Sequence, residues 1–491
     1  MSATGLGLNP FYGAFIDGEF DTDAEHRHGA VDPATGEHLA DVARCDATDV
    51  DRAVSAAAAA FGAWSRTLPE ERSRALHRIA DLIEADAERL AQIDSRDVGR
   101  HIREMREDYR MAVEHFRYFA SVTLAHEDFG RPIPGGYSIA KRVPLGVCGQ
   151  IIPWNDPVVM LAFKLAPALA AGNTVVLKPD ENASLATLEI CKHLSAALPK
   201  GVVNVVPGSG EEVGTAITGD PRVQKLAFTG STEVGRIIAA AAAQRLIPAT
   251  LELGGKSPNI VFPDVDDIDA VVEDATAAVI VCNGQSCLAG TRLFVHEDIY
   301  EEFVPKLVEH FGELVVGAPL DENTDVSCMI SARQGERVLA YIEAGRAEGA
   351  RILHGGRRVE VPGCPAGYFI EPTIFEATND MTIAQEEIFG PVLTVIKWND
   401  YETMIAEANA TEYGLASGIY TSNLRNAMET ADRLDAGSVW VNRYANLHGG
   451  TPFGGFKDSG LGREYCRETL NVYSQLKSIT FQGTTLRAHV K

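Results

Sequence analysis

The sequence lacks the features that would assign a class at once: a CxxC motif, an excess of basic residues and an uninterrupted apolar run. Its eight cysteines are scattered among 491 residues. This argues against a disulfide framework and a structural zinc site, and it favours a reducing cytoplasm. Residues 158–177 form the most apolar stretch, but Lys164, Pro167, Gly172 and Asn173 interrupt it. We therefore expect no metal site and no membrane-spanning helix, which needs about 20 mostly apolar residues.

The shortage of positive charge excludes a second group of functions. The chain has 44 Lys and Arg against 68 Asp and Glu, a net charge of −24. Such a surface repels nucleic acid and anionic membranes, so we expect neither as a partner. The first residues show no charged segment followed by an apolar one, so no signal peptide is expected. The length is enough for about two to four domains.

What the sequence does contain, from residue 143 onward, is a regular alternation of apolar strands and helices. The first set of strands is read from GVCGQIIPW, TVVLKP, VVNVVPG, KLAFTG and ATLELGG. A second alternation begins near Asn259 with SPNIVF, TRLFVH, PVLTVIKW and GSVWVN. Continuously apolar strands separated by helices are typical of parallel sheets covered on both faces. The pattern predicts an α/β protein whose nucleotide binds at the carboxyl ends of its strands, with a late strand in SQLKSITFQGTT.

Three polar side chains lie at positions where a fold of this kind places catalytic residues. Cys287, in VCNGQSCLAGTR, is a candidate nucleophile, although a small buried cysteine is an equally good reading. Glu252 closes a strand before a Gly-Gly turn and suits a general base, against a capping or ion-paired glutamate. Asn155 lies between two prolines, where its amide could donate to an oxyanion or merely satisfy its own turn.

Several turns after strands could hold a nucleotide. Lys178 and Glu181 follow one strand, and Gly230 and Ser231 follow another and open a helix. The amides at such a helix start can meet a pyrophosphate. Three further positions belong to similar turns: Gly210 in VVPGSGEEVG, which misses the GxGxxG spacing by one residue, and Glu387 and Phe389 in EEIFGPV.

Taken in order, seven stretches resemble the NAD(P)-dependent aldehyde dehydrogenase superfamily: PWN, LKPDE, FTGSTEVG, LELGGKSPN, GQSC, EEIFGPV and PFGGFKDSGLGRE. The resemblance implies that Cys287 attacks the aldehyde carbon to give a thiohemiacetal and then a thioester. It also implies that Asn155 and the Cys287 amide hold the oxyanion, and that Glu252 activates water to release the carboxylic acid. Because Glu252 is present, the resemblance is to the hydrolytic, non-acylating branch.

The same resemblance assigns the cofactor site. Lys178 and Glu181 would hold the adenosine ribose, and the carboxylate would repel a 2′-phosphate, so NAD is expected rather than NADP. The other expected contacts are Ile152, Trp154, Gly210, Gly230, Ser231, Glu387 and Phe389, while Asn442 resembles a family position near the active site. In the family fold, residues 1–122 and 144–254 would bind NAD and residues 255–473 would form the catalytic domain. Residues 123–143 and 474–491 would form strands that join subunits into a homodimer or homotetramer.

The chain departs from the family pattern at three places. Asp156 stands where most relatives have an aromatic residue, in a substrate tunnel expected to contain Asp156, Met160, Phe163, Ser286, Leu288, Leu447 and Phe453. The acid favours a polar or cationic aldehyde, unless it pairs with an arginine such as Arg443 and only shapes the wall; an aromatic or aliphatic aldehyde is the alternative. Cys282 is either a packing substitution or a partner for oxidised Cys287. The sequence of residues 97–105 also differs from the usual family sequence in this region.

Two other classes compete with this interpretation. A cysteine hydrolase would need a histidine partner, and none of the 13 histidines lies in a matching motif. A non-catalytic structural protein on the same fold is the other alternative. The presence of Cys287, Glu252 and Asn155 together argues against it.

Overall fold

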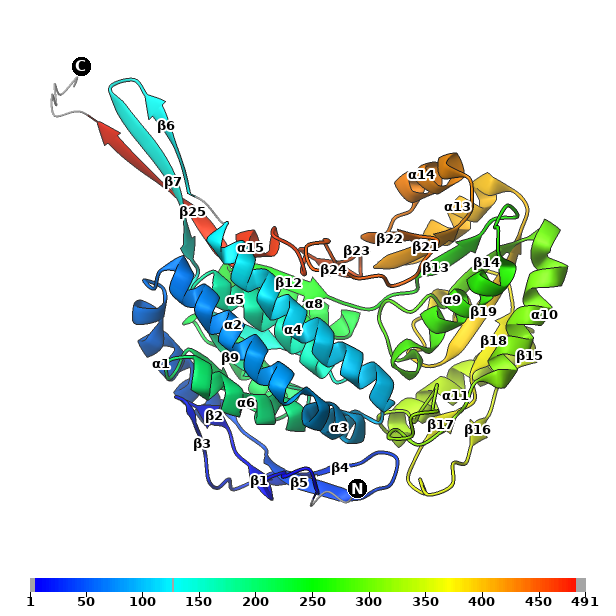
Figure 1. Cartoon of the computed structure of the whole chain (residues 1–491), viewed down its shortest axis with the longest axis horizontal. Coiled ribbons are helices and arrows are strands. Elements are labelled where there is room, and N and C mark those ends of the chain that lie inside the picture. Colours follow the sequence, from blue (N-terminus) through cyan, green and yellow to red (C-terminus); the bar gives the residue numbers. More distant parts are fainter. Residues whose placement is uncertain (1–4, 126–127, 483–491) are drawn as a thin grey trace.

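Two sheets of mainly parallel strands, both covered by helices, make up most of the molecule in the computed structural model, which describes residues 5–125 and 128–482 (Figure 1). The first sheet has the strand order β24-β12-β11-β8-β9-β10-β2-β3. Its strands are β2 (Phe15–Ile16), β3 (Glu19–Phe20), β8 (Val147–Ile151), β9 (Thr174–Lys178), β10 (Val203–Val205), β11 (Val223–Thr229), β12 (Ala249–Glu252) and β24 (Gly460–Leu461). The five strands from β12 to β10 are parallel to their neighbours in that set, as the apolar runs predict.

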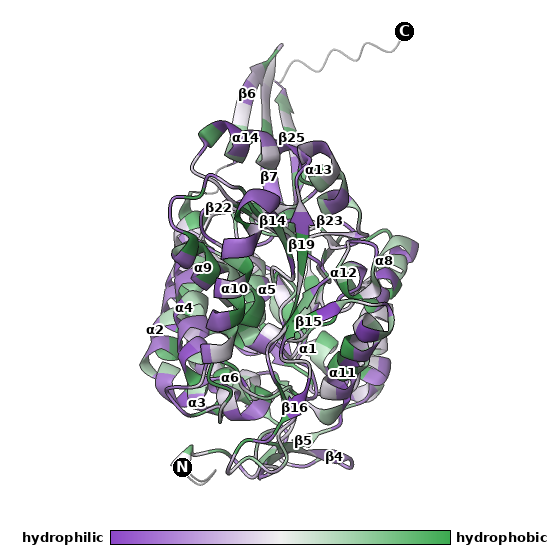
Figure 2. Ribbon diagram, turned by 90° about the vertical axis from the view of Figure 1, so that its right-hand side faces the viewer, coloured by the Kyte–Doolittle hydropathy of each residue, from purple (hydrophilic) through white to green (hydrophobic). Residues whose placement is uncertain are grey.

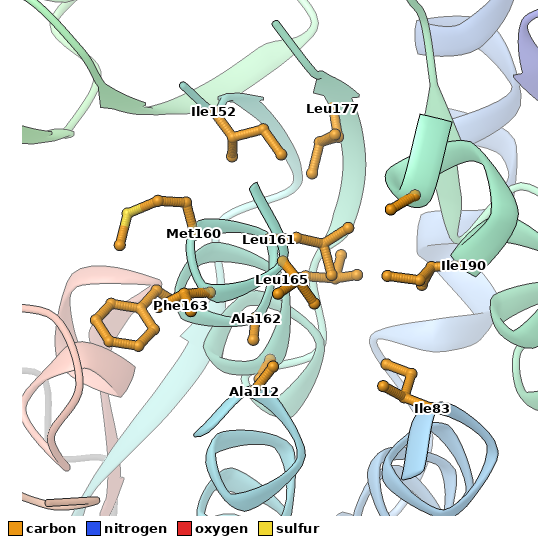
Figure 3. Close-up of a cluster of buried hydrophobic side chains, with 14 of the residues drawn as sticks. Ile83, Ala112, Ile152, Met160, Leu161, Ala162, Phe163, Leu165, Leu177 and Ile190 are labelled. Atoms are coloured by element: carbon orange, nitrogen blue, oxygen red, sulfur yellow. The ribbon is translucent and has the colours of Figure 1, made fainter. Parts of the chain in front are cut away.

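Both faces of the first sheet are buried. On β9, Val175 and Leu177 enter one hydrophobic cluster, while Val176 enters another on the opposite face. Figure 3 shows the first cluster, where Leu161 and Leu165 lie close to Ile190. The helices of this half are α1 (Ala47–Trp64), α2 (Pro69–Ala85), α3 (Ala87–Val98), α4 (Ile102–Leu124), α5 (Pro157–Ala170), α6 (Leu185–Ala197), α7 (Thr215–Gly219) and α8 (Thr232–Arg245), with a π-helical turn, η2 (Gly210–Gly214), before α7.

The junction between α3 and α4 matters for the site. α3 ends at Gly99, whose φ of 76° is left-handed, as is common for glycine just after a helix. A Cβ at this position would lie 2.6 Å from Cys328 Sγ, so the turn also needs the missing side chain. α4 begins after His101, and the short connection turns Arg100 inward, where it is among the largest fully buried side chains.

The second sheet has the order β15-β18-β19-β14-β13-β21-β22, and all its neighbours are parallel except β15 and β18. Its strands are β13 (Pro258–Val261), β14 (Arg292–His296), β15 (Arg351–His354), β18 (Thr373–Glu376), β19 (Val392–Trp398), β21 (Ala416–Tyr420) and β22 (Ser438–Val441). Its helices are α9 (Ile268–Ile280), α10 (Glu297–Glu313), α11 (Ala332–Ala347), α12 (Thr382–Gln385), α13 (Tyr401–Asn409) and α14 (Leu424–Arg433). Figure 2 shows hydrophobic residues on strands such as β19 and hydrophilic residues along the outer helices.

A three-stranded antiparallel sheet projects from the body (Figure 1). It consists of β6 (Phe129–Ile133), β7 (Gly136–Pro144) and β25 (Ser474–Gln482), with β25 paired along the whole of β7. The remaining short elements are β1 (Phe11–Tyr12), β4 (Arg27–Val31), β5 (His38–Ala43), the 3-10 turn η3 (Val281–Gly284), β16 (Arg358–Val359), β17 (Phe369–Ile370), β20 (Tyr413–Gly414), β23 (Phe456–Lys457) and α15 (Thr469–Val472).

The α/β class with parallel sheets is confirmed. The division into 1–122 with 144–254, 255–473, and 123–143 with 474–491 stays a prediction, and parts of it (1–4, 126–127 and 483–491) lie outside the described residues. Within 255–473, β24 returns to the first sheet and pairs with β12. Every helix in the described ranges is too short or too polar to cross a bilayer.

Candidate active site

Two of the three predicted chemical residues and all seven predicted tunnel residues line one pocket of about 360 Å³. Glu252 is the last residue of β12, and Cys287 follows η3 in the second half of the molecule. The tunnel residues in its wall are Asp156, Met160, Phe163, Ser286, Leu288, Leu447 and Phe453. Figure 3 shows Met160 and Phe163 on the side of α5 away from Ile190, so one helix serves both core and pocket. Asn155 is buried directly beside Asp156, in the loop after β8.

The loop that carries Cys287 has an unusual backbone. Cys282 and Asn283 have φ values of 54° and 57°, in the left-handed region that costs an ordinary residue about 1–2 kcal/mol. The Asn283 side chain holds the loop, because its Nδ2 donates to Gly99 O (3.1 Å) and Cys328 O (3.0 Å). Its Oδ1 accepts from the Ser327 amide at 2.7 Å.

Glycines in the motifs are explained by close approaches to the candidate catalytic groups. A Cβ on Gly255 would lie 2.1 Å from the carbonyl oxygen of Cys287, so the second glycine of LELGG must lack a side chain. A Cβ on Gly454, in PFGGF, would lie 2.8 Å from Glu252 Oε1. Gly255 therefore lets the chain pack against the main chain of Cys287, and Gly454 lets it pack against the Glu252 carboxylate.

The Cys287 thiol is half-buried, and its pKa is raised well above the usual value. Burial is the largest cause, followed by the negative charges of Asp156, Glu387 and Glu252. The resting thiol is therefore protonated at neutral pH, and forming the reactive thiolate requires a base.

Glu252 has the properties of such a base. It is 2% exposed, and neither of its carboxylate oxygens has a hydrogen-bond partner. Its pKa is raised well above the ordinary value by burial and then by the negative charge of Glu464. Glu464 itself pairs with Lys164 at 2.9 Å in a fully buried ion pair. An unpartnered carboxylate of raised pKa can accept a proton from a neighbouring thiol or water.

Asp156 is neutralised by an arginine, but the predicted partner was wrong. Asp156 Oδ1 lies 2.7 Å from Arg100 Nη1, whereas Arg443 pairs with Asp274 at 3.5 Å. The sequence could not reveal this partner, because Arg100 reaches the pocket only through the turn at Gly99. The unusual stretch 97–105 thus supplies pocket wall.

Further carboxylates gather around Arg100. Its Nη1 also donates to Asp108 Oδ2 (2.7 Å), and its Nη2 donates to Glu104 Oε2 (3.2 Å). Positive charge, from Arg100 first and then His101, outweighs burial and lowers the pKa of Glu104 to about 2. Burial raises the pKa of Asp108 to about 8 despite Arg100. The Cys282 thiol is buried and donates to Asp156 Oδ1 at 3.2 Å, so it belongs to this polar wall.

The residues predicted to hold a nucleotide lie along the carboxyl edge of the first sheet. Lys178 ends β9, Ile152 and Trp154 follow β8, and Gly230 and Ser231 follow β11. Ser231 is the N-cap of α8 and accepts from the Val234 amide, and a helix start of this kind can bind an anion. A Cβ on Gly230 would lie 2.4 Å from the Phe228 ring, so this turn stays free of a side chain. Gly210 opens η2 after β10, and Glu181 is exposed just beyond β9.

Glu387 and Phe389 reach this edge from the second half of the molecule. Glu387 Oε1 accepts from the Gly255 amide at 2.9 Å, and burial raises its pKa to about 7. Phe389 has a left-handed φ of 61°, and its ring meets Trp154 edge-on at 5.3 Å. The first and second halves of the molecule are therefore in contact at this edge, between the predicted cofactor residues and Cys287.

One residue missed by the sequence reading supports a fit to a nicotinamide cofactor. Thr229 Oγ1 is buried without a hydrogen-bond partner and lines the same pocket as Cys287. It directly precedes Gly230, so its position in FTGSTEVG was the available signal. Asn442, by contrast, lines a different pocket and pairs with the Thr421 backbone. No cluster of three metal-binding side chains occurs within the described residues.

Comparisons with known proteins show the family to which this chain belongs. A model described as "Aldehyde dehydrogenase family" matches residues 20–479. The chain is 43% identical over 483 residues to a fluoroacetaldehyde dehydrogenase of Streptantibioticus cattleyicolor, covering 96% of this chain and 95% of that protein. A Bacillus cereus aldehyde dehydrogenase in complex with NAD+ has a TM-score of 0.94 and 40% identity, with 98% and 99% of the two chains covered. An indole-3-acetaldehyde dehydrogenase mutant of P. syringae, in complex with NAD+ and IAA, has a TM-score of 0.95 and 39% identity, with 98% of each chain covered.

Proposed function

Because this chain belongs to the aldehyde dehydrogenase family and oxidises aldehydes with NAD as cofactor, we propose that Cys287 is its nucleophile, Asn155 its oxyanion donor and Glu252 its general base. The observation that carries this assignment is the single pocket that holds Cys287 and an unpartnered, buried Glu252.

The first step joins the enzyme to the aldehyde. Glu252 takes the proton of the Cys287 thiol as the sulfur attacks the carbonyl carbon. A C–S bond forms, and the π electrons of the carbonyl move to its oxygen. The Asn155 side chain and the Cys287 amide donate to that oxygen. NAD, when bound, accepts the hydride that leaves this carbon, and a thioester on Cys287 remains.

The second step releases the acid. Glu252 first loses the thiol proton to solvent, which lets it act as a base again. It then removes a proton from water, the resulting hydroxide attacks the thioester carbon, and the C–S bond breaks to release the carboxylic acid and the Cys287 thiolate. The thiolate takes the proton from Glu252, which restores the resting thiol. A raised pKa makes the Glu252 carboxylate a stronger base for this proton transfer than an ordinary glutamate. We therefore assign the chain to the hydrolytic branch, in which water and not coenzyme A receives the acyl group.

The cofactor would lie along the edge formed by Ile152, Trp154, Lys178, Glu181, Gly210, Gly230, Ser231, Glu387 and Phe389. Lys178 is buried, and its ammonium donates one hydrogen bond to Pro179 O, which leaves further N–H donors for ribose hydroxyls. Glu181 is exposed beside it and would exclude a 2′-phosphate, so NAD would be used in preference to NADP.

We assign an uncharged aldehyde with a compact apolar body as substrate. Asp156 is engaged by Arg100 and Asn155, and most other tunnel residues are apolar. A cationic aldehyde is the second candidate, because Glu104, Glu107, Asp108 and Asp156 outnumber Arg100 and Arg103 in the pocket wall. Both candidates disfavour an anionic aldehyde.

A substrate panel tests these assignments. NADH formation at 340 nm should occur with neutral alkyl and aryl aldehydes, should be weak with carboxylate-bearing ones, and should vanish in Cys287→Ala. Glu252→Gln should slow both the formation of NADH in the first turnover and the hydrolysis that allows further turnovers, without rescue by coenzyme A. The last comparison is the kcat/KM for an aminoaldehyde divided by the kcat/KM for an alkyl aldehyde, measured in the parent and in Asp156→Phe. If this ratio changes, Asp156 recognises cationic substrates, and a cationic aldehyde is the better assignment.

The projecting sheet supports a homodimer or homotetramer. Phe129, Tyr137, Leu476 and Phe481 are each more than half exposed on it, an arrangement typical of surfaces covered by another subunit. Light scattering would give the oligomer number. The eight cysteines are all unpaired, which supports work in a reducing cytoplasm.

A further inference from the structure

Asp156 holds the side-chain amide of its neighbour. Asn155 Nδ2 donates to Asp156 Oδ2 at 2.9 Å. Asp156 is also the N-cap residue of α5, where an aspartate usually accepts from the first helical amides and contributes about 1 kcal/mol. It makes no such capping bond. Its carboxylate is instead shared among Arg100, Asn155 and Cys282.

We propose that Asp156, neutralised by Arg100, is a positioning residue that presents the Asn155 amide to the substrate oxygen. The inference rests on the proposed role of Asn155 in the oxyanion site. It assigns a function to the unusual residue after PWN that does not depend on the charge of the substrate.

The orientation follows from the donors and acceptors involved. An ionised carboxylate only accepts hydrogen bonds, so the NH2 end of the Asn155 side chain must face Asp156, and the amide cannot flip. One of its two N–H groups is engaged in this way, and the second is available to the substrate oxygen. A fixed donor avoids reorganisation when charge develops in the transition state.

A carboxylate so close to a developing oxyanion would by itself oppose catalysis. Two like charges a few ångströms apart repel strongly in a partly desolvated pocket. Arg100 reduces this penalty, because its Nη1 lies 2.7 Å from Asp156 Oδ1 and the side chain is 2% exposed. The carboxylate can then orient the amide at little electrostatic cost.

Arg100 also holds the main chain of two loops, the one that carries Asn155 and the one that carries Cys287. Its Nη1 donates to the Asn155 carbonyl oxygen at 2.9 Å. Its other partner, Glu104, accepts from the Cys282 amide at 3.1 Å, at the start of the left-handed loop before Cys287. One buried guanidinium thus connects the oxyanion loop with the nucleophile loop.

The first experiment compares two reactions of Cys287. Acylation is followed as the pre-steady-state burst of NADH, and thiol reactivity as alkylation by iodoacetamide, which creates no oxyanion. Asp156→Ala should slow the burst by about 10- to 100-fold, less than the roughly 100- to 1,000-fold expected for Asn155→Ala. Alkylation should stay equal or become faster, because the negative charge of Asp156 raises the Cys287 pKa.

The outcomes distinguish the proposed role of Asn155 from the positioning role of Asp156. If Asn155→Ala leaves the burst unchanged, the proposed function of Asn155 fails. If that variant is slow and Asp156→Ala is not, only the positioning role fails. If Asp156→Ala slows alkylation as much as the burst, the loop is disordered and the positioning role is also wrong. Asp156→Asn, which keeps an acceptor, should recover most of the burst.

The second experiment tests the charge compensation. Arg100→Gln should slow the burst, and adding Asp156→Asn should make it faster again, because the uncompensated carboxylate is gone. Losses that simply multiply would overturn the proposal. Arg96→Gln is the matched control, since Arg96 is buried on α3 and pairs with Asp32 at 3.0 Å away from the pocket lining. It should lower Tm and keep the burst; an equal loss of burst would point to general destabilisation instead.

Discussion

The ammonium of Lys164 lies 2.9 Å from Glu464 Oε1, and neither side chain is exposed to solvent. Behind the unpartnered Glu252 there is therefore a buried ion pair and not bulk water. Its anionic member raises the Glu252 pKa, while its cationic member lowers it. The base is thus tuned by a pair whose two residues do not themselves line the substrate pocket.

Glu464→Gln should move the pH dependence of thioester hydrolysis to lower pH. The variant removes the charge that raises the Glu252 pKa and leaves Lys164 in place. Because Glu252 works deprotonated, its rate rises as pH passes through this pKa, and a lower pKa shifts the midpoint down. The breakdown of the acyl-enzyme formed from p-nitrophenyl acetate, followed between pH 5 and 9, measures it. Breaking a buried pair should also cost about 3–5 kcal/mol of stability.

The matched control for Glu464→Gln is Glu402→Gln. Glu402 forms an ion pair with Arg433 on the surface, so its loss should leave both the pH profile and Tm nearly unchanged. An upward shift in Glu464→Gln, or no shift, would contradict the tuning argument.

Alkylation of Cys287 in the absence of cofactor should keep accelerating from pH 7 to pH 9 without a plateau. Burial and three neighbouring carboxylates raise the thiol pKa above that range, so the thiolate fraction grows about tenfold per pH unit. Mass spectrometry of iodoacetamide-treated protein gives the rate and the site. The other seven cysteines are buried, so Cys287 should be labelled first. A plateau below pH 8 would mean that the resting enzyme already holds a thiolate.

Glu181→Gln should raise the ratio of kcat/KM with NADP to that with NAD by about tenfold or more, equivalent to roughly 1.4 kcal/mol. The change removes the carboxylate that would face a 2′-phosphate and keeps the size of the side chain. Steady-state assays with both cofactors measure the ratio. Glu211→Gln, an exposed carboxylate beside Gly210, is the control and should leave it within twofold of the parent. An unchanged ratio in Glu181→Gln would show that cofactor choice is made elsewhere.

Peroxide should oxidise Cys287 without producing a disulfide to Cys282. Burial raises the Cys282 pKa well above the usual value, so the thiolate needed to resolve a sulfenic acid is scarce, and its thiol is held by Asp156. Peptide mass spectrometry after graded oxidation should show the same Cys287 products in the parent and in Cys282→Ala. A linkage between residues 282 and 287 that protects activity would favour the redox interpretation of this cysteine.

The fold class could be predicted from the sequence for a physical reason: strands buried on both faces are continuously apolar, and parallel strands bring their carboxyl ends to one edge. The turns after β8, β9, β11 and β12 were therefore expected to be close together, and they are. The family and the cofactor were predicted from the resemblance of seven stretches to a known family.

The electrostatic wall of the pocket was not predictable in the same way. Arg100 and Asp156 are 56 positions apart, and their contact depends on the direction in which Gly99 turns the chain. Cys282 and Asn283 have left-handed backbone conformations, which a glycine in the sequence would usually indicate. Neither is glycine, and tertiary contacts hold them in this conformation. Local sequence patterns predict helices, strands and the turns within motifs. A buried ion pair depends instead on packing between segments that are distant in the sequence.

The late strands β24 and β25 have a consequence for biosynthesis. β25 completes a sheet whose other members lie some 330 positions earlier, and β24 closes the edge beside Glu252. Until these residues have left the ribosome, the hairpin of β6 and β7 has an unpaired edge, and such edges promote aggregation. A nascent chain of this protein therefore remains vulnerable until β25 has emerged from the ribosome, and the demand for chaperones should fall only then.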